Sequence, residues 1–330
     1  MPGTTRSSDT IRASRQEPSP RVVAVVVAWN RRELLQRCLD GIGTQRRPAD
    51  VVLVVDNAST DGSGDLAAGH PIVDEIISMP VNTGGAGGFT AGIAAAVQRH
   101  GADLVWIMDD DTVPTPGCLE VLLDTRALYP GRLALLASRA DWIDGREHPM
   151  NTPRTKVGAT RTERSRATAL GCRPIRSSSF VSVLLDAGAV RNTGLPVADY
   201  FLWNDDFEYT ARLLRRRRGL YVPAARVSHL TKVFGDSAAD PGPRFYQEVR
   251  NKTWLFTRSP ALSWWEKLIY GGSTLRRWVR TLAASRNRGV LARGLARGLR
   301  DGLLRRPRPN AEVLAGTPAA GDVAALESAR

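Results

Sequence analysis

Two uninterrupted apolar runs constrain the fold of this chain more than any other feature of its sequence. Val22–Val27 consists of valines with one alanine, and Val51–Val55 consists of valines with one leucine. A strand with one face in water alternates apolar and polar side chains, whereas a strand covered on both faces is apolar throughout. Strands of the second kind are typical of parallel sheets that carry helices on both sides. The two runs therefore predict an α/β fold with buried central strands.

Helix-like and strand-like segments alternate along the sequence that follows. Apolar residues recur at helical spacing over residues 31–42, which predicts a helix between the two runs. We expect further strands at 72–79, 104–108, 133–137 and 179–185, further helices at 84–99, 120–129 and 211–216, and two short strand pieces at 220–222 and 227–229 around Pro223. This alternation predicts a doubly wound sheet with helices on both faces, and such sheets bind ligands at the carboxyl ends of their strands.

Two segments do not follow the alternation. Residues 1–20 are polar and have no apolar period, which predicts a disordered tail. Residues 141–169 are rich in arginine and threonine, and we expect a long loop over the binding edge or a partly disordered segment.

The charge and the cysteine content narrow the classes of protein. The formal net charge is +13 and is carried mostly by arginine, which a GC-rich coding bias would also produce. Cys38, Cys118 and Cys172 are too few and too widely spaced for a disulfide framework or a zinc knuckle, which favours a reducing compartment. No apolar run approaches the roughly 20 residues of a membrane-spanning helix, and no signal peptide is expected.

Three consecutive carboxylates follow the expected strand at 104–108. Asp109, Asp110 and Asp111 would repel one another unless a cation or a donor neutralised them. Oxygen ligands at a strand end suit Mg²⁺ or Mn²⁺, and such an ion can neutralise a nucleotide diphosphate. The alternative is a solvated acidic loop. The sequence therefore predicts either a metal site or an exposed turn here.

Two other strand ends carry polar or glycine residues. Asp56 and Asn57 follow the second valine run and could accept hydrogen bonds from a nucleotide base or ribose, although such residues also cap helices. The segment from Gly84 to Phe89 includes Gly85, Gly87 and Gly88, and it leads into an expected helix. Its amides could approach an anionic ligand closely, or the segment could be a flexible turn.

A second acidic cluster and one histidine complete the candidate residues. Asp205, Asp206 and Glu208 follow Trp203 and lead into a helix. Paired acids raise the pKa of one carboxyl, which suits a general base, but acids also favour helix starts through the macrodipole. His229 follows a short strand, and its neutral imidazole could bind a metal or could be structural.

In this order, the motifs resemble those of the family 2 inverting glycosyltransferases of GT-A fold. The resemblance extends from about Val22 to Arg258. It rests on Ala28-Trp29-Asn30, Asp56 to Gly62, Asp109-Asp110-Asp111, Asp205-Asp206-Phe207-Glu208 and His229. The resemblance implies a Rossmann-like GT-A domain over residues 21–258, with a nucleotide-sugar-binding half at 21–125 and an acceptor half at 126–258.

The resemblance also implies a role for each candidate residue. Nucleotide-sugar binding is expected from Ala28, Asn30, Asp56, Asn57, Gly84, Gly85, Gly87, Gly88, Asp109 and Asp110. Divalent metal binding is expected from Asp109, Asp111 and His229, and acceptor binding from Trp203, Asp205 and Glu208. Asp206 matches the family's catalytic base. It would remove the acceptor hydroxyl proton as that oxygen attacks the anomeric carbon and inverts its configuration.

Two segments resemble one subgroup of the family. Gly84–Phe89 and Trp203–Asp206 are similar to bacterial cell-wall galactofuranosyltransferases, which use UDP-galactofuranose and a polyprenyl-diphosphate-linked acceptor. Rhamnosyltransferases that use dTDP-rhamnose share much of this pattern. In the galactofuranosyltransferases a tryptophan directly precedes the acid pair, whereas here Asn204 stands between Trp203 and Asp205. The departure bears on the acceptor site and on the linkage formed.

The sequence after Pro260 combines leucine, tryptophan and arginine at helical spacing. On a helix that includes Val290, the leucines at 291, 295, 299 and 303 lie on one side and the arginines at 293, 297 and 300 on the other. Residues 259–308 are therefore predicted to be a basic amphipathic helical extension that lies on an anionic membrane surface. The alternative is a helix packed on the catalytic domain. Residues 309–330 are expected to be a flexible tail.

The implied acceptor and the basic extension together predict peripheral attachment to the cytoplasmic face of the cell membrane. A nucleic-acid-binding protein is the competing class because of the net charge. The basic residues lie outside the expected α/β core, however, so we expect no nucleic acid as a partner. A catalytically inactive family member is disfavoured by the intact acid clusters. The sequence carries no signal for an oligomeric state.

Overall fold

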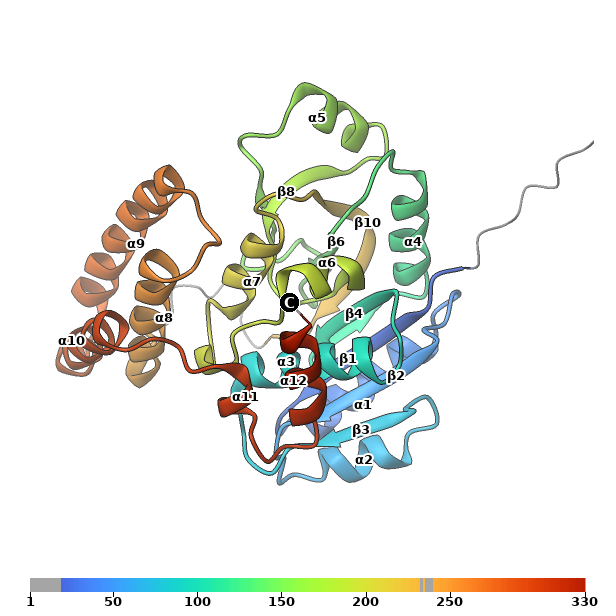
Figure 1. Cartoon of the computed structure of the whole chain (residues 1–330), viewed down its shortest axis with the longest axis horizontal. Helices are drawn as coiled ribbons and strands as arrows, with labels where there is room; N and C mark the ends of the chain where they lie inside the picture. The colour runs from blue at the N-terminus through green and yellow to red at the C-terminus, as the bar shows by residue number, and fades with distance from the viewer. Residues whose placement is uncertain (1–18, 232–233, 235–239, 330) are drawn as a thin grey trace, which may run out of the picture.

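A central sheet with helices on both faces forms the body of the molecule (Figure 1). The computed structural model describes residues 19–231, 234 and 240–329, so the tail expected at residues 1–20 lies almost wholly outside it. The strands are β1 (Val22–Ala28), β2 (Val51–Asp56), β3 (Glu75–Ser78), β4 (Leu104–Asp109), β5 (Thr112–Pro114), β6 (Leu135–Asp141), β7 (Arg154–Thr155), β8 (Arg173–Ser177), β9 (Val183–Asp186) and β10 (Gly219–His229). Their order is β3-β2-β1-β4-β9-β6-β10-β8-β7, and β5 pairs with β10.

The valine-rich strands lie at the centre of the sheet, as the sequence predicts. β1 pairs in parallel with both β2 and β4, and β2 pairs in parallel with β3. Val23, Val25 and Val27 contribute to the hydrophobic core on one face, whereas Val22 and Val26 contribute to the core on the other. Both faces of β1 are therefore buried, which is why the run has no polar residue.

Helices cover the two cores. The helices up to residue 213 are α1 (Arg32–Gly43), α2 (Ser63–Gly69), α3 (Gly84–Gln98), α4 (Cys118–Leu128), α5 (Arg161–Thr168), α6 (Ala187–Thr193) and α7 (Asp205–Leu213). Helices α1 and α4 contribute to one core, and α3, α6 and α7 to the other. Helices α1, α3 and α4 match the expected helices within two residues, and α7 begins six residues before the helix expected at 211–216. The sequence did not predict α2 or α6.

Three expectations for the second half of the sheet need correction. The loop expected at 141–169 contains β7 and α5, and Thr160 caps α5 by accepting a hydrogen bond from the Glu163 amide. Residues 173–177 form β8, which the sequence did not predict. The pieces expected on either side of Pro223 are one strand, β10, whose pairing with β6 shifts register between Val222 and Arg226. A register shift lets the strand accommodate the proline.

The strand β5 places the chain's second half against the first. It pairs antiparallel with β10, and His229 lies opposite Thr112 in this pairing. The histidine is thereby brought beside the three consecutive aspartates, although about 120 residues separate them in sequence. This pairing is what allows one site to draw on both halves of the sheet.

Three further helices form a group at the edge of the sheet (Figure 1). They are α8 (Phe245–Thr257), α9 (Trp264–Ala284) and α10 (Arg288–Leu304). Helices α9 and α10 confirm that residues 259–308 are helical, whereas α8 lies before this range and was not predicted. Gly298 and Gly302 on α10 lie directly against Val249 and Thr253 of α8, where an added Cβ would approach within 2.7 and 2.5 Å of them. Leu291 is fully buried. α10 therefore packs on the catalytic domain, as in the alternative considered above.

The expectation of a flexible tail at 309–330 was wrong. Residues Asn310–Val313 form α11, and Ala320–Ser328 form α12. Leu314, Val323 and Leu326 are buried in the same core as α3, and Arg99 donates to Asp322 across 2.7 Å. The apolar spacing in this short segment is too brief to reveal its partner from the sequence alone. Among the helices that the structure describes, none is long and apolar enough to span a bilayer.

Candidate active site

The candidate residues gather where the strand order reverses, between β1 and β4. In the parallel pairings, Ala28 lies opposite Asp56 and Val27 opposite Asp109. The three strand ends therefore lie side by side at one edge of the sheet. This is the position at which open α/β sheets bind their ligands, and it is where the site was expected.

An arginine reaches into the aspartate cluster. The Arg31 guanidinium donates to Asp110 Oδ1 at 3.2 Å and to Asp111 Oδ2 at 2.5 Å, and the Trp29 amide donates to Asp110 Oδ2 at 3.0 Å. Burial nevertheless raises the pKa of Asp110 to about 6. Burial also raises the pKa of Asp109 well above its usual value, and the charges of Asp111 and Asp110 raise it further. The raised pKa values show that one arginine does not offset the cost of ionising all three carboxyls here.

Asp111 and His229 face each other across 3.1 Å, from Oδ1 to Nε2. The other ring nitrogen, Nδ1, lies 2.9 Å from Asn151 Oδ1. When Nδ1 carries the proton and donates to Asn151, the lone pair of Nε2 points toward the carboxylate. In that tautomer Asp111 Oδ1 is buried and receives no hydrogen bond from any residue that the structure describes. Two facing acceptors of this kind fit a cation between or beside them.

The expected metal ligands are only partly brought together. No three histidine, cysteine, aspartate or glutamate side chains within the described part of the chain converge as a complete metal site. Asp111 and His229 do converge, while Asp109 does not complete a trio with them. Mg²⁺ and Mn²⁺ are commonly held by one or two protein carboxylates together with substrate phosphates and water. The residues present therefore fit a cation that the donor's diphosphate would help to hold.

The loops after β1 and β2 are tied to each other at the rim of the site. Asn30 Oδ1 accepts from the Thr60 amide at 2.7 Å, and the Asn30 amide donates to Ser59 Oγ at 3.0 Å. Asn30 has a φ of 52°, a left-handed conformation that asparagine tolerates better than most residues. Asp56 accepts from the Ser59 amide at 3.1 Å and is largely buried. Asn30 thus shapes the rim, and Asp56 stays at the strand end where a base or ribose was expected.

Asn57 does not face a ligand, contrary to the expected role. Its Nδ2 donates to the Gly84 carbonyl at 2.9 Å, and its Oδ1 accepts from the amide and hydroxyl of Thr83 at 2.9 and 3.0 Å. Both polar atoms of its side chain are therefore engaged within the protein. Asn57 therefore positions the glycine segment.

Most of the glycines serve packing, which corrects a second expectation. Gly84 has a φ of 70°, and a Cβ there would lie 2.0 Å from the Phe201 carbonyl oxygen. A Cβ at Gly88 would lie 2.5 Å from Val27, and one at Gly87 would lie 2.4 Å from Thr83. Only Gly85 of the four has open space around it. The segment is glycine-rich because the chain itself, rather than a ligand, approaches its backbone.

The second acid pair lies across from the aspartate cluster. Asp205 is buried. Its pKa is raised to about 8, mainly by burial and secondly by the negative charge of Asp206. The charge of Asp205 also contributes to the raised pKa of Asp109, after burial and the charges of Asp111 and Asp110. The structure therefore brings Asp205 and the end of β4 to the same region.

Asp206 has a different environment. Its carboxylate accepts from the Phe207 amide at 2.6 Å. Burial raises its pKa, while that amide and the positive charges of Lys252 and Arg154 oppose the increase. Glu208 is buried and bound by Arg212 at 2.8 Å and by the Ser259 hydroxyl at 2.6 Å. The acceptor-binding role expected for Glu208 is therefore not supported, because its carboxylate is occupied within the protein.

A buried asparagine that the sequence did not single out holds the segment before α7. Asn251 on α8 donates through Nδ2 to the carbonyls of Tyr200, Leu202 and Trp203, at 2.9, 2.9 and 2.8 Å. Trp203 and Asn204 both have a φ of 66°. Such conformations persist only where the surroundings hold them. Asn251 thus holds the strained segment that carries Trp203 and precedes the acid pair. No pattern in the sequence identifies Asn251 as having this role.

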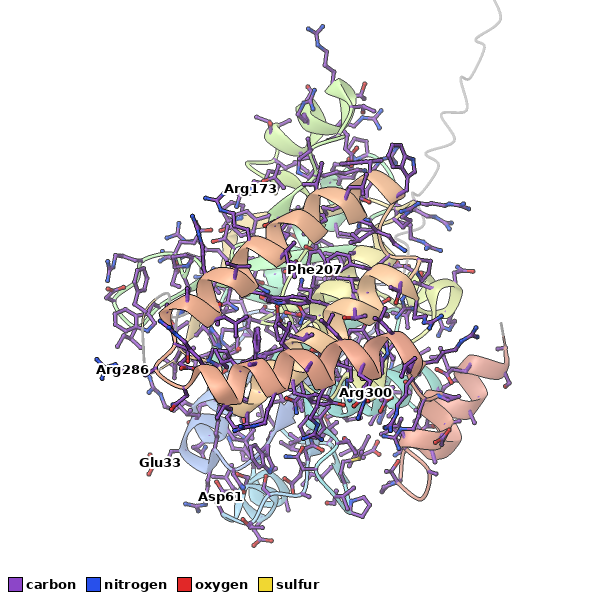
Figure 2. The ribbon with its side chains drawn as sticks, turned by 90° about the vertical axis from the view of Figure 1, so that its left-hand side faces the viewer. Glu33, Asp61, Arg173, Phe207, Arg286 and Arg300 are labelled. Carbon is purple, nitrogen blue, oxygen red and sulfur yellow. The ribbon has the colours of Figure 1, made fainter. Side chains whose placement is uncertain are left out.

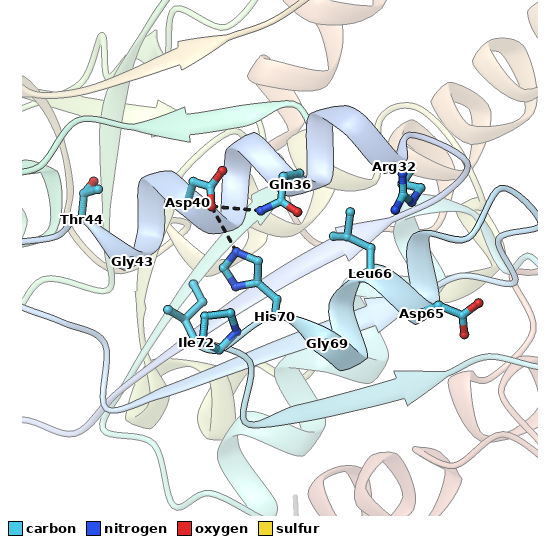
Figure 3. Close-up of a pocket in the computed structure, with 11 residues that line it drawn as sticks. Arg32, Gln36, Asp40, Gly43, Thr44, Asp65, Leu66, Gly69, His70 and Ile72 are labelled. Atoms are coloured by element: carbon cyan, nitrogen blue, oxygen red, sulfur yellow. Dashed lines mark hydrogen bonds and ion pairs between the residues drawn. The ribbon is translucent and has the colours of Figure 1, made fainter.

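A hollow elsewhere on the surface does not contribute to this site. It has a volume of about 590 Å³ and lies between α1 and α2. His70 Nε2 lies 3.2 Å from Asp40 at its wall (Figure 3). None of the expected site residues lines it.

Comparison with known proteins agrees with this geometry. Residues 23–168 match the family described as Glycosyl transferase family 2. The galactofuranosyltransferase GlfT1 of Mycolicibacterium smegmatis is 31% identical over 199 residues, which cover 59% of this chain and 65% of that protein. GlfT1 of Mycobacterium tuberculosis is 32% identical over 204 residues, which cover 59% of this chain and 64% of that protein. The alignments therefore span slightly less than two thirds of these relatives.

Solved structures show the same fold at low sequence identity. S. aureus TarS superposes with a TM-score of 0.58 at 15% identity, covering 94% of this chain and 52% of TarS. GalNAc-T7 superposes with a TM-score of 0.58 at 14% identity, covering 92% of this chain and 59% of that chain. The chain therefore has a GT-A fold, its residues 23–168 match the family described as Glycosyl transferase family 2, and it resembles the galactofuranosyltransferases GlfT1.

Proposed function

We propose that this protein is a metal-dependent inverting glycosyltransferase. It transfers galactofuranose from UDP-galactofuranose to a polyprenyl-diphosphate-linked glycan during cell-wall polysaccharide synthesis. The observation that carries the proposal is the placement of Asp111 and His229 at one strand edge, with the Asp205–Asp206 pair across from them. Similarity to GlfT1 supports galactofuranose as the transferred sugar.

A divalent cation, Mn²⁺ or Mg²⁺, fits the proposed donor site. Asp111 and His229 would hold it, and Asp109 would face the ribose and the cation. The structure of GalNAc-T7, which shares the fold, contains UDP, GalNAc and Mn²⁺. When bound, the cation neutralises charge on the departing diphosphate. Asn151 orients His229 through Nδ1, so that Nε2 is left free for this role.

The protein's own residues provide the remaining functions. Ala28, Asn30 and Asp56 border the nucleotide at the ends of β1 and β2. Asp206 accepts the proton of the attacking acceptor hydroxyl, and burial supports this role because it raises the pKa of the carboxyl. Trp203 lies in the segment that Asn251 holds, Asp205 begins the helix that follows it, and both contact the acceptor.

A panel of sugar nucleotides tests the proposed donor. We expect UDP release with UDP-galactofuranose in the presence of a lipid-linked acceptor and Mn²⁺. A rhamnosyltransferase that uses dTDP-rhamnose is the competing function. Transfer from dTDP-rhamnose with none from UDP-galactofuranose would establish that alternative.

We further propose peripheral attachment to the cytoplasmic face of the cell membrane, through α9 rather than α10. The large apolar side chains on one side of α9 are between 44% and 75% exposed; they are Trp264, Trp265, Leu268, Ile269, Leu275 and Val279. Residues 259–308 contain twelve arginines or lysines and only two acids. An apolar helical face with a basic surround fits an anionic lipid surface.

Sedimentation with phosphatidylglycerol vesicles tests this attachment. Combined substitution of Trp264, Leu268 and Leu275 by serine should abolish co-sedimentation and leave UDP binding intact. Leu303→Ser is the matched control, because Leu303 is 53% exposed but lies on α10. Equal loss in the control, or none in the triple variant, would refute docking through α9.

A further inference from the structure

Lys252 on α8 is a buried cation with no ion-pair partner among the residues that the structure describes. The residue is only 7% exposed. Within the part of the chain that the structure describes, no hydrogen bond or ion pair reaches Nζ, which lies 4.7 Å from the centre of the Phe207 ring. An unpaired buried ammonium is costly to folding. Retaining one beside a candidate active site suggests a use for its charge.

The nearest acid on the same helix is already occupied. Glu248 accepts from Asn204 Nδ2 at 2.7 Å, from Trp278 Nε1 at 3.4 Å and from the Arg277 guanidinium. These three donors engage both carboxylate oxygens. Glu248 therefore acts on Lys252 at a distance and does not pair with it.

A second cation lies at the same aromatic ring. The guanidinium of Arg154, on β7, lies 5.4 Å from the centre of Phe207 and 5.6 Å from that of Tyr270 on α9. No hydrogen bond or ion pair of its side chain is found among the described residues. Figure 2 looks onto α9 and α10, with Phe207 labelled between them. Two cations from distant parts of the chain thus converge beside one partly buried aromatic ring.

This pair of cations lies next to the proposed base. Their positive charges oppose the burial-induced rise in the pKa of Asp206, which places them within electrostatic reach of that carboxyl. The pKa of Lys252 is itself lowered to about 8, mainly by burial and also by the charges of Arg277 and Arg154, while the charges of Glu248 and Asp206 oppose this decrease. Among the described residues, however, no anion makes a direct hydrogen bond or ion pair with either cation.

We propose that Lys252 and Arg154 form a subsite for a phosphate group of the acceptor substrate, beside Asp206 and against the Phe207 ring. The inference rests on the proposed function, since it names the part of the acceptor that binds there. Lysine and arginine make strong charge-assisted hydrogen bonds to phosphate oxygens. The subsite would hold the acceptor by its diphosphate and direct its hydroxyl toward Asp206.

Thermal unfolding of the full chain separates a functional lysine from a structural one. Lys252→Met replaces the unpaired ammonium by an apolar side chain of similar length, so Tm should rise by about 2–4 °C. Lys267→Met, on partly exposed α9, is the matched control and should leave Tm unchanged. A lower Tm for Lys252→Met would mean that the charge stabilises the fold, which overturns the proposal.

Amine labelling tests the anion site without relying on transfer activity. The chain has only four lysines, at positions 156, 232, 252 and 267, so each can be followed by mass spectrometry. Inorganic pyrophosphate should slow the labelling of Lys252 but not of Lys267, and Arg154→Gln should remove this protection. Equal protection of both lysines, or none, would contradict a built site. These outcomes hold even if the chain transfers a different sugar.

Kinetics identify the source of the phosphate. With an acceptor that carries a diphosphate, Lys252→Gln should raise the acceptor KM by about 10–100-fold, and Lys252→Arg should restore most of it. With the same glycan on a neutral aglycone, the variant and the parent should have similar KM values. Equal effects on both acceptors would mean that Lys252 acts through Asp206. Protection of Lys252 by phosphatidylglycerol vesicles alone would assign the anion to a lipid headgroup. Either result overturns the acceptor subsite.

Discussion

The guanidinium of Arg176 on β8 forms a salt bridge with the carboxylate of Glu266 on α9. Nε lies 2.6 Å from Oε1, and both side chains are buried. Arg176 also donates to the carbonyl oxygens of Ala211 and Ala261. Glu266 in turn completes the capping box of α9 by accepting from Ser263. One ion pair therefore joins the start of α9 to the edge of the sheet.

Glu266→Ala should destabilise the protein by about 3–5 kcal/mol, because it leaves Arg176 charged, buried and without its partner. Urea unfolding measures this change. The exposed pair of Asp144 with Arg146 offers a control, since Asp144→Ala should cost less than about 1 kcal/mol. Similar small effects in both variants would show that α9 is not held by this pair.

The buried carboxyl of Asp205 should make stability depend on pH. Burial and Asp206 raise its folded-state pKa to about 8, well above the value near 4 expected in the unfolded chain. The folded state therefore binds the proton more tightly, and its stability should fall as pH rises from about 4 to 8. Asp205→Asn should flatten this part of the curve. Urea midpoints measured across the range would reveal an unchanged slope if the carboxyl were ionised in the folded protein.

Asp206→Asn should lower kcat by about 10²–10⁴-fold with little change in UDP affinity, because a general base acts only on the acceptor proton. Asp205→Asn is the comparison, since both residues lie on the first turn of α7. Steady-state rates with a fixed acceptor measure the effect. If Asp205→Asn were the inactive variant and Asp206→Asn the active one, the roles of the two would be reversed.

Asp111→Asn should abolish turnover and weaken donor binding without eliminating it, because Asp111 is one of two protein groups proposed to hold the cation. Excess EDTA should have the same effect on the parent protein, and added Mn²⁺ should restore its activity. Calorimetric titration of UDP with and without Mn²⁺ would measure the binding part. Full activity in EDTA would exclude a cation requirement.

Leu326→Ala should cost about 2–5 kcal/mol, the range for truncating a large side chain in a packed core. Leu326 is 1% exposed and lies in the core shared with α3. Leu304→Ala is the control, because Leu304 is 78% exposed and its truncation should change stability by less than about 0.5 kcal/mol. Equal, small effects would indicate that α12 does not contribute to the core.

The sequence predicted the central sheet well because its signal is local. An unbroken valine run strongly favours a strand that is buried on both faces, and β1 is buried on both faces as expected. The clustering of Asp56, Asp109 and His229 at one edge also followed, since parallel strands share their carboxyl ends. The link between His229 and Asp111 depends on the antiparallel pairing of β5 with β10, which no local pattern encodes.

The roles of polar side chains were harder to predict because their partners are distant in sequence. The side chain of Asn57 forms hydrogen bonds with Thr83 and Gly84. The carboxylate of Glu208 accepts a hydrogen bond from Ser259, which lies 51 residues away. Gly298 and Gly302 weaken an isolated helix, but in the folded protein they let α8 approach closely. A glycine or a carboxylate in a motif can thus serve packing or a ligand equally well, and only tertiary contacts distinguish the two.

The position of α12 also determines when during synthesis the domain can finish folding. Proteins emerge from the ribosome from the amino terminus onward, and domains fold as their parts become available. The face of α3 that Val323 and Leu326 cover belongs to residues 84–98, whereas these two residues are made more than 200 residues later. That apolar face therefore stays open to water or to a chaperone until α12 has been synthesised. A ribosome that stops early would release a sheet with its binding edge built and one core uncovered, a natural target for proteolysis.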